Sequence, residues 1–111
     1  MNFENLDVWK RSARLSADIY KATAKLKDFG FRDQLTRSGL SVPSNIAEGM
    51  TREGDKEKRR FLDIAYSSLA EVRTQIYIGI DVGYLDSHNG QKWIEETKQL
   101  SAMLTCLKRK F

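Results

Sequence analysis

Apolar residues in this chain recur at three- and four-residue steps, which is the spacing of a helix that buries one face. Positions rich in glycine, asparagine and aspartate divide the pattern into four segments. The spacing predicts helices over approximately residues 6–27, 31–49, 55–82 and 90–110, and no strand. Because the connections are short, neighbouring helices should run antiparallel. We therefore expect a single all-α domain, an up-down-up-down four-helix bundle.

The expected helix boundaries rest on a few local signals. Asn5 is a good N-cap for the first helix, and Gly49 suits a left-handed stop for the second. Pro43 lies inside the second segment, where a proline removes one backbone hydrogen bond and presses on the carbonyl four residues earlier. That carbonyl belongs to Gly39, whose missing Cβ leaves room to bend. We expect one continuous, slightly kinked helix.

The first segment has a wider apolar face than a bundle helix needs. At about 100° per residue, its apolar positions form two strips that together span about 200°. The strip suited to the core comprises Val8, Leu15, Ile19 and Leu26, and the second comprises Leu6, Trp9, Ala13 and Tyr20. Because monomers rarely expose large apolar patches, we expect Trp9, Ala13 and Tyr20 to contact another copy of the chain. The alternative is that they lie half-buried at the bundle edge.

Composition excludes several classes of protein. A chain of 111 residues suits one domain, and no apolar run approaches the roughly 20 residues of a membrane-spanning helix. Cys106 is the sole cysteine, so no intrachain disulfide forms. The first residues show neither a basic leader nor an apolar signal segment, and we expect a cytoplasmic protein with no membrane association.

The residues that usually carry chemistry are scarce. The sequence has a single histidine, His88, and no glutamate is followed three residues later by histidine, as a di-iron bundle requires. A zinc site is not expected either, because the sequence has only one histidine and one cysteine. No glycine-rich phosphate loop is present. We expect a non-enzymatic protein without metal or cofactor.

A polar stripe follows the second segment at three- and four-residue steps, and one glutamate of the third segment could face it. These residues are Gln34, Arg37, Ser41, Asn45, Glu48 and Glu71. Two interpretations are open. The stripe could bind a ligand, but buried polar groups at a bundle seam usually set register, so a structural network between helices or subunits is favoured.

Basic residues exceed acidic ones by 19 to 15, which gives a net charge of +4. Four of them share the face of the first segment opposite its apolar arc: Lys10, Arg14, Lys21 and Lys25. A second cluster closes the chain: Lys108, Arg109 and Lys110. Such a stripe can follow a phosphate backbone, although solvated lysine faces are ordinary on bundle exteriors. A helix-turn-helix at 35–41 fits poorly, since Leu35 stands where a small residue is needed.

Several motifs resemble those of one family. They are, in chain order, Phe3-x-x-Leu6-x-Val8-Trp9, Phe29-Gly30-Phe31, Ser41-Val42-Pro43-Ser44-Asn45-Ile46-Ala47-Glu48-Gly49 and Ser68-Leu69-x-Glu71. The chain resembles the proteins encoded in intervening sequences of bacterial 23S ribosomal RNA genes, also called the S23 ribosomal protein family. The ribosomal label reflects the location of the genes.

This resemblance implies a left-handed four-helix bundle that assembles as a homopentamer. It also implies kinship with the accessory proteins of diversity-generating retroelements, which resemble basic pentameric barrels that engage a reverse transcriptase and nucleic acid. The leading hypothesis is a homo-oligomer whose basic outer surface binds structured RNA or another nucleic acid. The alternative is a scaffold that recruits a partner protein and has no direct role with nucleic acid.

Overall fold

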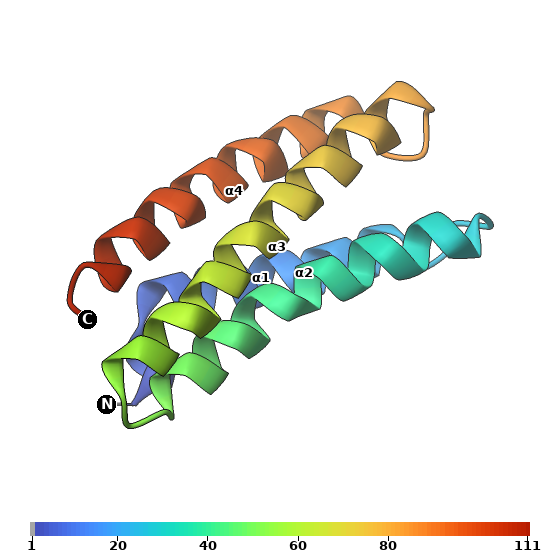
Figure 1. Cartoon of the computed structure of the whole chain (residues 1–111). Coiled ribbons are helices and arrows are strands. Elements are labelled where there is room, and N and C mark those ends of the chain that lie inside the picture. Colours follow the sequence, from blue (N-terminus) through green and yellow to red (C-terminus); the bar gives the residue numbers. More distant parts are fainter. Residues whose placement is uncertain (1) are drawn as a thin grey trace.

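Four helices make up most of the part of the chain that the structure describes, residues 2–111. The computed structural model places a short 3-10 turn, η1 (Phe3–Asn5), before α1 (Asp7–Ala22), α2 (Phe29–Met50), α3 (Asp55–Asp81) and α4 (Ser87–Lys108) (Figure 1). No strand occurs within these residues, and the prediction of a single all-α domain with four helices is confirmed. Figure 1 shows both termini at the end of the molecule that carries the α2–α3 turn.

Two helices begin earlier than the sequence predicts, because aspartates cap them. The Asp28 side chain accepts a hydrogen bond from the Phe31 amide at 3.0 Å, so α2 begins at Phe29. The Asp86 side chain accepts from the Asn89 amide at 3.0 Å, so α4 begins at Ser87. The expected starts at residues 31 and 90 were wrong, since each aspartate satisfies an amide that would otherwise lack a partner.

The ends of α1 also differ from the prediction. Asn5 lies in η1, and Leu6 occupies the N-cap of α1 without a side-chain hydrogen bond. The helix ends at Ala22 rather than near residue 27, and the buried Thr23 hydroxyl donates to the Ile19 carbonyl at 2.8 Å. That bond satisfies one of the carbonyls at the helix end, where the chain turns away.

Pro43 lies within a single helix, as the sequence predicts, and is buried. Gly39, four residues earlier, packs against α1: a Cβ there would lie 3.6 Å from Ile19 Cδ1. Gly49 does not end the helix, which continues to Met50. It is buried where α2 approaches α3, and a Cβ there would lie only 2.9 Å from Phe61 Cβ. Close packing, not a left-handed turn, therefore explains this glycine.

One apolar core joins the four helices. Its most completely buried large side chains are Ile19, Leu35, Ile46, Leu62, Leu69, Ile76, Leu100 and Leu104. The molecule measures 43 × 22 × 20 Å, and its length agrees with the roughly 40 Å expected of a 27-residue helix. No helix within residues 2–111 has the length and apolar content to cross a lipid bilayer.

Candidate nucleic-acid interface

Three basic residues extend along the outward face of α1. Lys10, Arg14 and Lys21 are exposed, and no carboxylate among the described residues lies within ion-pair distance of them. From Lys10 to Lys21 the helix rises about 16 Å, or roughly five 3.4 Å steps along a nucleic-acid strand. We call these three residues the α1 basic stripe.

Lys25 was expected on the same helical face, but α1 ends before it. It is exposed in the turn that leads to α2, so its position no longer follows from helical spacing. The stripe on the helix therefore consists of three cations, with Lys25 beyond its end.

The C-terminal basic cluster is only partly free. Lys108 Nζ donates to Asp63 Oδ1 at 2.8 Å, so this cation already has an acidic partner. Arg109 and Lys110 are exposed, and neither forms an ion pair within residues 2–111. Two of the three predicted cations at this end thus remain available to an anionic partner.

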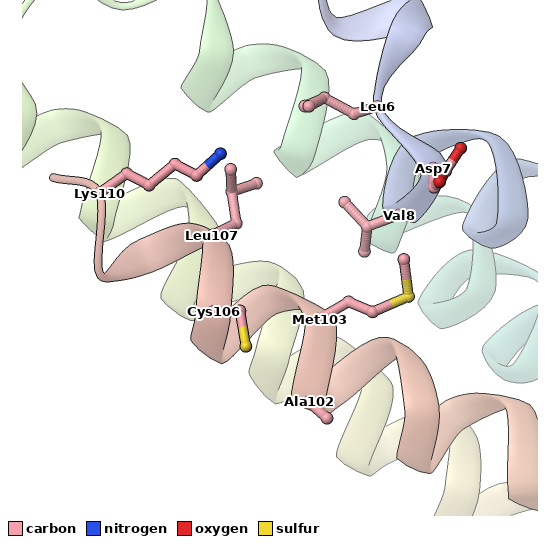
Figure 2. A pocket seen from close by; sticks show the side chains of 8 residues that line it. All are labelled: Leu6, Asp7, Val8, Ala102, Met103, Cys106, Leu107 and Lys110. Atoms are coloured by element: carbon pink, nitrogen blue, oxygen red, sulfur yellow. The ribbon is translucent and has the colours of Figure 1, made fainter.

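A groove joins the end of α4 to the start of α1. Its volume is about 380 Å³, and its lining is Leu6, Asp7, Val8, Ala102, Met103, Cys106, Leu107 and Lys110. Figure 2 shows Val8 from α1 and Met103 from α4 pointing toward one another, with Lys110 at the C-terminal end of the groove. The groove places Lys110 beside the first turn of α1, the turn that also carries Lys10.

The polar stripe of the second segment lies at the α2–α3 seam. Ser41 Oγ and Ser68 Oγ are 2.8 Å apart, and Asn45 Nδ2 donates to the Ser41 carbonyl at 2.8 Å and to its hydroxyl at 2.9 Å. These three residues form a partly buried network between the two helices. Ser41 and Asn45 therefore take part in a polar network between helices, the kind of contact that a structural role for the stripe predicts.

The remaining members of the stripe are exposed and do not join that network. Arg37 Nε lies 3.1 Å from Asp33 Oδ2, and Glu48 Oε1 lies 2.6 Å from Arg52 Nη2, both within α2 or at its end. Gln34, Arg37 and Glu71 line a shallow hollow of about 310 Å³ with Ser38, Ser41, Ser68 and Gln75. The polar stripe thus lies on the surface along the α2–α3 seam. Among its members, only Ser41 is hydrogen-bonded to α3.

The second apolar strip of the first segment is partly covered within one chain. The Trp9 ring packs edge-on against Phe3, with centroids 5.3 Å apart, and Trp9 and Ala13 are half-buried beside α2. Tyr20 is 39% exposed. Trp9 and Ala13 nevertheless line an open hollow of about 370 Å³ together with Leu40 of α2, so apolar surface at this strip stays accessible to a second copy.

Cross-helix bonds of Arg11 and Arg73 were missed by the sequence reasoning. Arg11 Nε donates to Glu96 Oε2 at 2.9 Å and links α1 to α4, and the Glu96 carboxylate raises the Arg11 pKa. Arg73 Nε donates to Thr97 Oγ1 at 2.9 Å and links α3 to α4. Partners 85 and 24 residues apart leave no local spacing signal that could have found them.

Asp28 and Tyr84 join the two turns at the end opposite the termini. Hydrogen bonds from the Phe31 amide and the Tyr84 hydroxyl hold the pKa of Asp28 below its ordinary value. The hydrogen bond that the Tyr84 hydroxyl donates to Asp28 raises the pKa of Tyr84. Phe31 also packs edge-on against Tyr84, at 5.3 Å between centroids.

Metal-ligating side chains do not gather anywhere in the described part of the chain: no group of three or more His, Cys, Asp or Glu could hold an ion there.

A family model described as 23S rRNA-intervening sequence protein matches residues 4–106 of this chain. The chain belongs to this family. The resemblance inferred from its motifs is confirmed.

A solved structure is similar to this 23S rRNA-intervening sequence family member. It is the crystal structure of a protein of unknown function from the S23 ribosomal protein family of Bacteroides thetaiotaomicron. The two are 21% identical and match with a TM-score of 0.84 over 91% of this chain and 97% of that one. At this identity the likeness shows the fold alone. The comparison with curated proteins gives no match.

Proposed function

We propose that this family member is a non-enzymatic, cytoplasmic homo-oligomer whose basic outer surface binds structured RNA. The observation that carries the proposal is the α1 basic stripe, whose cations are exposed and without acidic partners in the described chain. Free lysines and arginines on one face can replace the counterions of a phosphate backbone. Arg109 and Lys110 extend the same charge toward the C-terminus.

The proposed architecture is an up-down-up-down, left-handed bundle that assembles as a homopentamer. Exposed apolar side chains of α3, Ile64, Ile78 and Val82, support assembly through this helix. They are 37–55% exposed, and packing against a second copy would remove their apolar area from water. An oligomer would present several copies of the α1 basic stripe, and binding would gain from avidity.

Fluorescence anisotropy with a structured RNA, at about 50 and 200 mM salt, tests the RNA proposal. The triple variant Lys10→Gln, Arg14→Gln, Lys21→Gln should bind more weakly, and its salt dependence should fall by about one released counterion per lost cation. The matched control, Lys56→Gln, Lys92→Gln, Lys98→Gln, removes the same charge from exposed positions elsewhere. If both triple variants lose the same RNA affinity, the loss reflects net charge alone, and the α1 basic stripe is not the binding surface.

The second candidate is a scaffold that recruits a partner protein. The apolar groove lined by Leu6, Met103 and Leu107 favours it, because a groove of this kind fits an apolar anchor side chain. A pull-down after nuclease treatment that recovers one stoichiometric protein, lost in a Met103→Glu variant, would support this function. If the wild-type protein binds no RNA at about 50 mM salt, the partner-recruiting scaffold becomes the better proposal.

A further inference from the structure

A second hollow opens at the α1–α2 end of the molecule, opposite the termini. Its volume is about 570 Å³, within the roughly 300–1,000 Å³ of small-ligand sites. The residues that line it are Tyr20, Phe29, Gly30, Arg32, Asp33, Thr36 and Arg37. Two aromatic rings and two guanidinium groups thus surround one opening, a combination that the sequence did not single out.

Arg32 is the unusual member of this lining. Its Nε is buried and has no hydrogen-bond partner, and nothing else in residues 2–111 accepts from its guanidinium or pairs with it. The Nε is closed off from solvent, whereas the terminal Nη groups, which also have no hydrogen-bond partner within residues 2–111, can donate to an acceptor from outside the chain. Its planar fork matches the oxygens of a phosphate.

Arg37 adds a second cation that is easily released. Its one ion pair within the described chain is with Asp33, at 3.1 Å, and the two side chains are 78% and 61% exposed. A pair so exposed contributes little stability and can exchange its partner. Arg37 can therefore contact a phosphate at the hollow, although the Asp33 carboxylate, which lines the same hollow, would oppose the phosphate charge.

Phe29 supplies an unused aromatic face. It is 72% exposed, and within the described chain it has no aromatic partner, whereas the nearby Phe31 packs against Tyr84. Tyr20, on the same hollow, is 39% exposed. Exposed rings of this kind form stacking platforms for unpaired bases, which offer a flat π face whatever their identity.

The surroundings of the hollow carry positive charge. Segment 18–37 contains five cations and three carboxylates, and Lys21 of the α1 basic stripe follows directly after Tyr20. Lys25 and Lys27 are exposed in the turn before Phe29. The hollow therefore lies at the same end of α1 as Lys21, the last member of the α1 basic stripe.

We propose that this hollow binds one unpaired nucleotide of an RNA, with its base stacked on Phe29 and its phosphate held by Arg32 and Arg37. The inference rests on the proposed RNA-binding function and assigns to it a preference for looped or single-stranded segments. An acidic peptide without aromatic residues would satisfy the arginines but would leave the exposed rings without a flat partner. A nucleotide satisfies both.

Two RNAs with the same stem test the proposal by anisotropy: a hairpin with an unpaired loop, and a blunt duplex. Phe29→Ala should weaken hairpin binding about ten-fold, within the range known for the loss of one stacked base, and should leave duplex binding unchanged. Phe29→Tyr keeps the ring and should bind the hairpin normally. Tyr77→Ala, at an exposed aromatic of α3, is the matched control. Arg32→Gln should weaken hairpin binding and lower its salt dependence by about one counterion.

The outcomes separate this inference from the proposed function. Wild-type binding to both RNAs, with Phe29→Ala either harmless or equally harmful to both, overturns the nucleotide site and leaves RNA binding standing. Wild-type protein that binds neither RNA overturns both proposals. If Phe29→Ala alters the mass measured by light scattering but not hairpin affinity, Phe29 belongs to a protein interface and the nucleotide site is wrong.

Discussion

Glycines mark the closest approaches in this bundle at the scale of single residues. A Cβ at Gly79 of α3 would lie 2.6 Å from Leu85 Cδ1 and 2.9 Å from Phe31 Cζ. Nothing in the local pattern distinguishes such a glycine from one in a turn, as the misassigned Gly49 illustrates. The distinction depends on what packs against the backbone.

Gly79→Val should destabilise the protein by about 1–3 kcal/mol, because the added side chain overpacks the contact with Leu85 and Phe31. Ala70→Val, on the exposed side of α3, is the control and should change the free energy of unfolding by no more than about 0.5 kcal/mol. Urea denaturation followed by circular dichroism measures both. Equal effects of the two substitutions would contradict the close contact at Gly79.

Asp28 should make stability depend on acid pH. Its pKa is lowered in the folded chain by bonds from Phe31 and Tyr84, so the ionised form stabilises the fold above the ordinary pKa of 3.8. This contribution is lost as the pH falls below 3.8 through the folded-state pKa. In the Asp28→Asn variant the side-chain amide would keep a cap but would not titrate. The stability difference between wild type and this variant, measured by urea denaturation, should therefore shrink from about pH 6 to about pH 2.5; a constant difference would contradict this role.

At the scale of helices, α1 and α4 are joined by Arg11 and Glu96 through two nitrogen–oxygen contacts. The guanidinium also donates to Gln99 Oε1 at 2.6 Å. Side chains from helices at opposite ends of the sequence thus meet at a seam whose outer part, near Val8 and Met103, is the open groove of Figure 2.

A double-mutant cycle of Arg11→Met and Glu96→Gln should give a coupling energy of about 1 kcal/mol, the upper end for a partly exposed pair, since the geometry is bidentate. The coupling should fall as salt is added. The Arg60–Glu57 pair of α3 is more exposed and serves as the comparison. Thermal unfolding of both sets of variants measures the energies, and a smaller coupling for Arg11 and Glu96 would refute their role at the seam.

At the scale of the whole molecule, α3 presents two exposed sides that differ in their neighbours. Ile78 is 50% exposed and lies three residues after Gln75, which is bonded to α2, whereas Tyr77 is 49% exposed and lies four residues after Arg73, which is bonded to α4. The two residues are adjacent and equally accessible. They therefore make a matched pair for locating an interface between copies.

Ile78→Glu should reduce the mass measured by light scattering toward the 12.8 kDa of one chain, because a buried, unpaired carboxylate is costly in an apolar interface. Tyr77→Glu should leave the mass of the wild-type oligomer unchanged. Circular dichroism should show full helix content in both. Dissociation by Tyr77→Glu alone would place the interface on the other side of α3.

The sequence by itself determined four helices, a continuous α2 through Pro43 and the cationic face of α1, because helical periodicity alone decides which side chains share a face. Tertiary structure decided which cations stay free: Lys108 meets Asp63, whereas Lys10 and Lys21 meet no carboxylate among the described residues. It also brought Tyr20 and Arg32 to one hollow. These contacts depend on how distant helices pack, which the spacing of residues along one helix does not encode.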